Sequence, residues 1–186
     1  MSQKKQDIIE TAFRLFSENG FYATGIDQII AESNVSKKTL YTHFSSKIDM
    51  ILAVLQYYEQ SFISELQSKV LNPQADPHNK LIRIFETAQS WYSTNKFNGC
   101  LAISAMGEFG NKNEDIVKAC ISFKQAERNI LLSLLNEMEL LDADQVADHL
   151  LIVLEGIGVT AHIGSITPSQ DSIRRLVDNV LLGKST

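Results

Sequence analysis

The sequence predicts an all-α protein of about nine helices. Apolar residues recur every three or four positions along most of the 186 residues, which is the spacing of helices with one buried face. No run alternates apolar and polar residues as a half-buried strand would. Three prolines interrupt the chain and 44% of its residues are hydrophobic, so it is long and apolar enough to bury a core.

Four helices are expected in the N-terminal third. An amphipathic helix over residues 4–19 should end at Gly20, because glycine commonly follows the last turn of a helix. Two short helices should follow, over residues 26–32 and 37–44. A long fourth helix over residues 47–71 should stop ahead of a proline.

Five more helices are expected in the rest of the chain. Asp76 followed by a proline indicates the start of the fifth, because Asp caps helices and proline fits the first turn. The sixth is mostly apolar and should be buried all round. The ranges expected for the sixth to ninth helices are residues 100–109, 113–140, 142–163 and 168–183.

The stretch of residues 33–47 has the features of a helix-turn-helix. It contains three lysines and a histidine, and it has no acidic residue. Asn34 suits the turn because Asn tolerates the left-handed conformation, and Ser36 is a good N-cap for the second helix. A short turn between two short helices is the arrangement that places the second helix in the major groove of DNA.

The second helix of this motif should carry hydrogen-bond donors on its outer side. Leu40 and Phe44 are one turn apart and should face inward. The residues left for the outer surface and the helix start are Lys37, Lys38, Thr39, Tyr41 and His43. Such side chains suit base edges and phosphate oxygens. The alternative is a solvated basic face on an ordinary helical hairpin.

Residues 5–55 resemble the N-terminal domain of the TetR (tetracycline-repressor-like) family of bacterial transcriptional regulators. The resemblance runs without a gap through IETA at 9–12, LF at 15–16, ENGF at 18–21, Ile29, VS at 35–36, TLY at 39–41, HF at 43–44 and Lys47. It departs at Gly25, where the family usually has Ser or Thr, and at Lys38, where Gly or Pro is common. Because Gly25 has no hydroxyl for a phosphate, the neighbouring Thr24 is the residue expected to supply one.

The resemblance implies a DNA-binding regulator, most often a repressor, that leaves a palindromic operator when a small molecule binds to it or reacts with it. It implies a DNA-binding domain over residues 1–47 and an effector-binding and dimerisation domain over 48–186, linked by the helix at 47–71. The implied partners are double-stranded DNA, a second copy of the chain and a small-molecule effector, without a membrane. Two cysteines without a secretory signal indicate a reducing cytoplasm. The residues expected to contact DNA are Thr24, Ser36, Lys37, Lys38, Thr39, Tyr41, His43 and Lys47.

Two further surfaces follow from the resemblance. The residues expected to bind the effector are Phe62, Trp91, Cys100, Met106, Phe123 and His162. The last two helices should pair with their copies in a dimer through Val153, Ile157, Ala161, Ile173, Leu176 and Val180. The alternative is an interior helix of a monomer, because a helix that is apolar on several faces must be covered on several faces.

Cys100 is the residue with two open interpretations. It follows Asn98 and Gly99 at an expected helix start, where free amides stabilise a thiolate. The segment also resembles a TetR subgroup in which a cysteine at this place senses oxidants or electrophiles. A repressor that senses such compounds through Cys100 is therefore one hypothesis, and a buried, inert cysteine is the other.

The charge distribution allows a DNA partner although the net charge is −5. Residues 1–47 hold six basic and five acidic side chains, whereas residues 48–186 hold 11 and 17. A near-neutral head with a local basic patch, on an acidic body, can still bind DNA at one end. The four histidines lack paired ligand spacing, so neither a metal nor another cofactor is expected. A small helical enzyme with an incidental helix-turn-helix remains the alternative from another class, although no nucleophile–base pair supports it.

Overall fold

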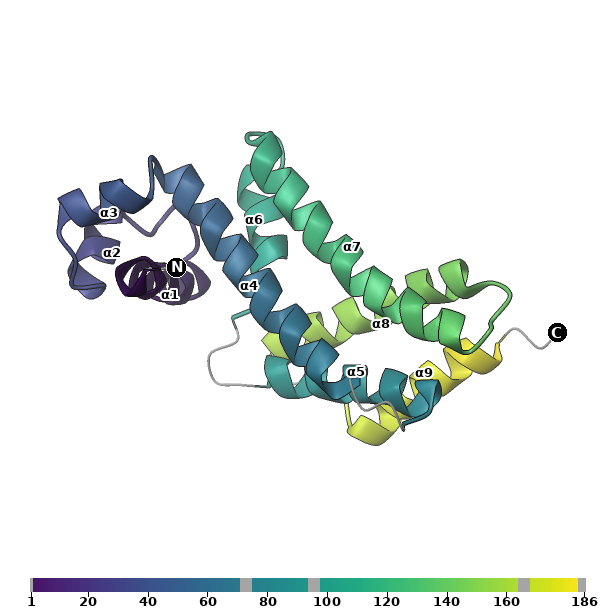
Figure 1. Ribbon diagram of the computed structural model, residues 1–186. Helices are drawn as coiled ribbons and strands as arrows, with labels where there is room; N and C mark the ends of the chain where they lie inside the picture. The colour runs from purple at the N-terminus through teal and green to yellow at the C-terminus, as the bar shows by residue number, and fades with distance from the viewer. Residues whose placement is uncertain (1, 71–74, 94–97, 164–167, 184–186) are drawn as a thin grey trace. The chain divides into compact units, whose positions relative to one another are not determined.

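The computed structural model describes residues 2–70, 75–93, 98–163 and 168–183 (Figure 1). The described residues form nine α-helices and no strand, so the predicted fold class is confirmed. The helices are α1 (Gln3–Asn19), α2 (Ile26–Glu32), α3 (Lys37–His43), α4 (Lys47–Val70), α5 (Pro77–Tyr92), α6 (Leu101–Phe109), α7 (Glu114–Glu137), α8 (Ala143–Ile163) and α9 (Gln170–Leu182).

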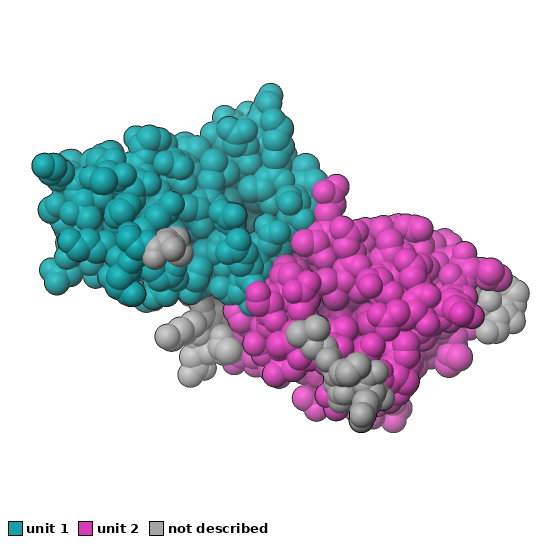
Figure 2. All heavy atoms as spheres, in the orientation of Figure 1, with its two compact units in different colours: residues 1–61, 100–123 teal, residues 62–99, 124–186 magenta. Residues whose placement is uncertain are grey.

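The chain forms two compact units, which Figure 2 distinguishes by colour. Unit 1 contains residues 1–61 and 100–123, and unit 2 contains residues 62–99 and 124–186. Unit 1 therefore holds the first three helices and also all of α6. The boundary predicted after residue 47 divides the chain by function, into a DNA-binding part and an effector-binding part. The compact units do not test that division, so the boundary stays a prediction.

Unit 1 has a core to which its first three helices and the start of α4 contribute. Helices α1, α2 and α3 contact one another. Their inward side chains are almost fully buried, as expected from the apolar stripe of each helix. The buried set includes Ile8, Ala12, Phe16, Phe21, Ile29, Leu40, Phe44, Met50 and Ile51. Aromatic rings extend this core, since Phe21 lies 4.9 Å from Phe16 and 5.9 Å from Phe109 between ring centroids.

Unit 2 is built on the contacts of α5 with α8 and α9 and of α8 with α9. Its core contains a group of aliphatic side chains and a group of aromatic side chains. The aliphatic part includes Leu81, Ile84, Ala88, Val146, Leu150 and Leu154. In the aromatic part, the ring of Phe62 stacks on Tyr92 and meets Trp91 edge to face, each at 5.5 Å between centroids.

Local sequence signals set several helix starts. Asn34 has a φ of 53°, the left-handed conformation expected for the turn. Ser36 accepts a hydrogen bond from the N–H of Thr39, and Asp76 accepts one from the N–H of Asn79, so both caps are confirmed. The expectation that α6 is buried all round is wrong. Its outer face is exposed, with Ile103 at 54% and Met106 at 37%.

Candidate nucleic-acid interface

The α2–turn–α3 segment is a helix-turn-helix with a well-defined second helix. Leu40 and Phe44 are each only 1% exposed, and they fix one side of α3 against α1 and α2. The Ser36 hydroxyl caps the start of α3, at 3.1 Å from the N–H of Thr39, and lies 2.8 Å from the Thr39 hydroxyl. The outer side of α3 is thereby held in one orientation, which suits contact with a groove.

The outer side of α3 presents polar groups to solvent. Lys37, Lys38 and Tyr41 are exposed, and Tyr41 is 48% exposed. The Lys37 ammonium lies 3.4 Å from a carboxylate oxygen of Asp27, and both side chains are mostly exposed. Such a surface pair contributes little stability, so a phosphate or a base edge can replace the carboxylate at small cost. Thr39 and His43 are half-buried on the same helix.

Lys47 stands at the first position of α4. The helix start is capped by Ser46, whose hydroxyl accepts a hydrogen bond from the N–H of Asp49 at 3.1 Å. Burial lowers the pKa of Lys47, and the nearby Glu108 carboxylate acts in the opposite direction. Lys47 is half-buried and close to the surface of unit 1, a position compatible with the predicted phosphate contact.

Thr24 does not fit the predicted role. Its side chain is fully buried, and its hydroxyl lies 3.1 and 2.8 Å from the backbone carbonyl oxygens of Leu15 and Gly20, to which it donates. A hydroxyl used in this way ties the end of α1 to the turn before α2. The predicted phosphate contact did not take into account that two backbone carbonyl groups near the end of α1 bind this hydroxyl.

Glu108 is a residue that the sequence interpretation missed. One of its carboxylate oxygens accepts the N–H of Phe21 at 2.8 Å, and the other accepts the N–H of Tyr22 at 2.7 Å. A Cβ added at Gly20 would lie 3.1 Å from the carboxylate, and Gly20 has a φ of 84° that side chains rarely adopt. We call this arrangement the Glu108 clasp. It attaches α6 to the turn between α1 and α2, within unit 1.

Aromatic contacts reinforce the clasp. The ring of Tyr22 stacks on Phe109 at 4.9 Å between centroids, and the Lys112 ammonium lies 4.9 Å from the centroid of the Tyr22 ring. Cation–π contacts of this length are favourable. The helix-turn-helix is thus connected to α6 by two hydrogen bonds and by ring contacts, in addition to its covalent continuation into α4.

The predicted effector residues are divided between the units. Phe62, Trp91 and His162 belong to unit 2, whereas Cys100, Met106 and Phe123 belong to unit 1. Within this set, Phe62 and Trp91 are in ring contact. Phe123 is 3% exposed and packs edge to face on Tyr58, and His162 is exposed beside Gly99. Cys100 is half-buried at the N-cap of α6, where its side chain makes no capping hydrogen bond.

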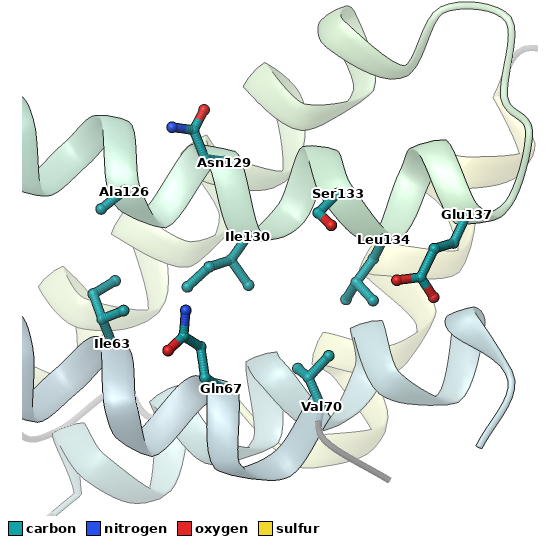
Figure 3. A pocket seen from close by; sticks show the side chains of 9 residues that line it. All are labelled: Ile63, Gln67, Val70, Ala126, Asn129, Ile130, Ser133, Leu134 and Glu137. Atoms are coloured by element: carbon teal, nitrogen blue, oxygen red, sulfur yellow. The ribbon is translucent and has the colours of Figure 1, made fainter. Parts of the chain in front are cut away.

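Unit 2 also contains a groove that the sequence did not indicate. It has a volume of about 600 Å³ and lies between the C-terminal half of α4 and α7 (Figure 3). Apolar and amide side chains line much of it, and the full lining is Ile63, Gln67, Val70, Ala126, Asn129, Ile130, Ser133, Leu134 and Glu137. None of the six predicted effector residues is among them. The size of the groove falls in the range of small-molecule sites.

The α8–α9 surface differs in part from the predicted dimer interface. Ile157 and Ile173 are each 4% exposed, so they pack inside one protomer. A different row on α8 faces solvent, with Ile152 at 69%, Val159 at 59% and Ile163 at 58%. These positions are seven and four residues apart and therefore share one side of the helix. Leu176 of α9 is 47% exposed, as an interface residue should be in a single chain.

The other three predicted dimer residues, Val153, Ala161 and Val180, are half-buried. Helix α8 is the one helix among the described residues that is long and apolar enough, by length and composition, to cross a membrane. A core or interface helix of a folded protein meets the same criterion.

Comparison with known proteins gives the same class as the geometry. Residues 8–54 match the family model of bacterial regulatory proteins of the tetR family. The HTH-type regulator YerO of Bacillus subtilis is 45% identical over 58 residues, which are 31% of this chain and 20% of YerO. The HTH-type transcriptional activator FasR of Mycolicibacterium smegmatis is 37% identical over 62 residues, or 33% of this chain and 28% of FasR. The chain therefore spans less than a third of the length of these two relatives.

Solved structures extend the likeness to the whole fold. A TetR-family regulator of Streptomyces coelicolor has a TM-score of 0.88 and 23% identity, with 100% of this chain and 98% of that chain covered. A transcriptional regulator of Saccharomonospora viridis, solved in complex with choline, has a TM-score of 0.79 and 21% identity, with 99% and 98% covered. The whole chain is therefore similar in fold to these two regulators. The family match thus covers residues 8–54, and the fold of the chain is similar to that of TetR-family regulators.

Proposed function

We propose that the protein is a repressor that binds a palindromic operator as a homodimer and leaves it when a small molecule binds to residues 48–186. The observation that carries the proposal is the outer side of α3. This capped helix presents Lys37, Lys38 and Tyr41 to solvent from the helix-turn-helix. The second helix of such a motif is the one that reads base edges, which supports the proposal.

The DNA-binding part is tested with two lysine variants. Lys37→Ala should change the preference among operator variants, because Lys37 lies at the start of α3 where base edges are read. Lys47→Ala should weaken binding to all DNA sequences alike. It should also reduce the slope of log affinity against log salt concentration by about one per protomer, because a phosphate contact releases a counterion. Lys118→Ala, at a 71% exposed side chain on α7, is the control and should change neither property.

The measurement is fluorescence anisotropy with an inverted repeat taken from the DNA beside the gene, at several salt concentrations. If Lys37→Ala and Lys47→Ala lose the same affinity for every DNA sequence, the division between base and phosphate contacts is contradicted. Failure of the unsubstituted protein to bind any such repeat would contradict the proposed function itself.

The dimer is proposed to form over the exposed row of α8 together with α9. The double variant Val159→Asp with Leu176→Asp should be monomeric and should lose operator binding, because it places charges on two exposed apolar positions. Leu141→Asp is the control, since Leu141 is fully exposed between α7 and α8. Sedimentation in detergent-free buffer checks this prediction. An unsubstituted protein that is monomeric at micromolar concentration, or that needs detergent to stay dispersed, would overturn it.

Repression and the effector need a separate experiment. A reporter gene under the operator should be expressed more strongly when the regulator is deleted, whereas an activator, as FasR is described, would give the opposite result. The protein has one conformation that fits DNA and another that does not. The small molecule releases the protein from DNA because it binds the second conformation more tightly than the first. The hypothesis of a Cys100 sensor stays a prediction, and an unchanged response in Cys100→Ser would exclude it.

A further inference from the structure

A cluster of charged side chains lies between α7 and α8 in unit 2. The Lys124 ammonium donates to a carboxylate oxygen of Glu127 at 2.8 Å and to one of Glu155 at 2.6 Å. The Glu127 side chain is fully buried, whereas Lys124 and Glu155 keep 21% and 30% of their side-chain surface. One lysine thus serves two carboxylates, and the three groups carry a net negative charge when both acids are ionised.

The second oxygen of Glu127 is the unusual feature. Glu127 Oε1 is buried and accepts no hydrogen bond from any described residue. Buried polar atoms are nearly always paired, because an unpaired one loses its water without compensation. Burial, and after it the charge of Glu155 and a side-chain hydrogen bond with Glu155, raise the pKa of Glu127 to about 7 against the lowering effect of Lys124. The site is therefore short of one donor.

Aromatic side chains lie close to the same face of α8. The ring of Tyr92 is 3.4 Å from the position that a Cβ would occupy at Gly158. Gly158 is three residues after Glu155, so the two positions are neighbours on the helix surface. Tyr92 in turn stacks on Phe62, which meets Trp91. Glu155, which shares the Lys124 ammonium with Glu127, therefore stands within about one helical turn of an aromatic cluster.

We propose that Glu127 and Glu155 form the polar end of a binding site for a hydrophobic organic ammonium ion, with N–H groups that donate to Glu127 Oε1. The apolar part of the ligand lies toward Tyr92, Trp91 and Phe62, whose rings offer apolar contact. A metal ion is the poorer occupant, because the described residues contain no group of three side chains suited to hold one. The inference rests on the proposed function in one respect, namely that a ligand of unit 2 affects DNA binding.

The experiment uses the full-length protein and a panel of three probes, which are 2-phenylethylammonium, butylammonium and the neutral 2-phenylethanol. Binding is measured by calorimetry and by the fluorescence of Trp91, the single tryptophan of the chain. At about pH 8 Glu127 is mostly ionised, and 2-phenylethylammonium should bind at least about tenfold more tightly than the alcohol. The affinity should fall about tenfold for each pH unit below about 7, as Glu127 takes up its proton.

Glu127→Gln is the decisive variant, because it keeps the shape and removes the charge. It should lower the affinity for 2-phenylethylammonium at least about tenfold and leave that for the alcohol unchanged. Glu114→Gln is the matched control on the same helix, since its side chain is 92% exposed, and it should behave as the unsubstituted protein. Thermal unfolding of each variant confirms that it is folded.

Three outcomes would overturn the inference. These are equal binding of the ammonium ion and the alcohol, unchanged binding in Glu127→Gln, and no binding of any probe up to about 10 mM. Any of them would make the cluster a structural ion network. The failure of the proposed function looks different. A protein that binds the ammonium ion but never binds an operator would support this site and contradict the repressor.

Discussion

Two glutamates, one in each unit, meet opposite surroundings. In unit 1, both carboxylate oxygens of Glu108 accept backbone N–H groups, from Phe21 and Tyr22. In unit 2, Lys124 serves one oxygen of Glu127, and the other oxygen is buried without a donor among the described residues. The difference separates a carboxylate that holds two segments together from one that still lacks a partner.

The physical cause is the supply of donors near each carboxylate. The turn after α1 exposes N–H groups that have no helical partner, and a carboxylate from α6 satisfies two of them at once. Glu127 lies on a helix whose own N–H groups are used by the helix, so only side chains can serve it. The same substitution should consequently have opposite effects at the two sites.

Glu108→Gln is expected to give the larger effect. The amide NH₂ group would face one of two backbone N–H donors, and the N–H of Phe21 lies at a fully buried residue. The free energy of unfolding should fall by about 2–3 kcal/mol, the cost of leaving such a donor unsatisfied. Urea unfolding followed by circular dichroism measures this, with the exposed Glu114→Gln as control. A loss no larger than that of the control would show that water replaces the carboxylate.

Glu127→Gln should have the opposite sign above neutral pH. The pKa of Glu127 is raised from 4.5 to about 7, so the folded protein binds a proton more tightly than the unfolded chain. Stability contributed by this group is therefore full at low pH and is lost as the pH rises from about 4.5 to about 7. The variant should be about 1–2 kcal/mol more stable than the unsubstituted protein at about pH 8, because the weaker pairing with Lys124 offsets part of the gain.

Urea unfolding at several pH values measures this difference. The advantage of Glu127→Gln should disappear near pH 5, where the carboxyl group of the unsubstituted protein is protonated. A difference that does not change with pH would mean that Glu127 does not titrate in this range. Lys124 and Glu155 are the charged groups that act on its pKa. Since the charge of Glu155 raises that pKa, Glu155→Gln should make the advantage smaller and complete it at a lower pH.

The sequence predicted the helices well because their signals are local. Asn34, Ser36 and Asp76 set the turn and the two helix starts through hydrogen bonds within three residues or through their own φ. The predicted helix bounds differ from the structure by at most a few residues for the same reason. The exposed face of α3 followed from spacing alone, since Leu40 and Phe44 are buried one turn apart.

The long-range contacts were beyond such reasoning. Glu108 bonds to residues 86 and 87 positions earlier, and nothing in its neighbourhood marks it as a partner of that turn. The row at Ile152 was missed because α8 is apolar on several sides, and spacing cannot say which side the protomer itself covers. Glu127 did carry a signal. It continues the stripe of Cys120 and Phe123, where a buried position holds an acid.

The smallest expected effect concerns the cation at the edge of the clasp. The Lys112 ammonium lies 4.9 Å from the centroid of the Tyr22 ring, and Tyr22 is 56% exposed. Lys112→Ala should reduce the free energy of unfolding by about 0.5 kcal/mol, the value of an exposed cation–π contact. Lys112→Arg should retain most of the stability, because a guanidinium also binds an aromatic face.

A double-mutant cycle isolates this contact. In a Tyr22→Leu background the ring is gone, so Lys112→Ala should have almost no further effect. If Lys112→Ala costs the same in both backgrounds, the lysine acts through another group and the ring contributes nothing. The two sites differ in what surrounds the carboxylate. Glu127 is surrounded by the charged groups of Lys124 and Glu155, which form an ion pair with each other. In the clasp, the carboxylate of Glu108 lies beside the stacked rings of Tyr22 and Phe109. A measurable coupling at Lys112 would therefore show that the clasp is held by its rings as well as by its carboxylate, as expected for a carboxylate whose role is structural.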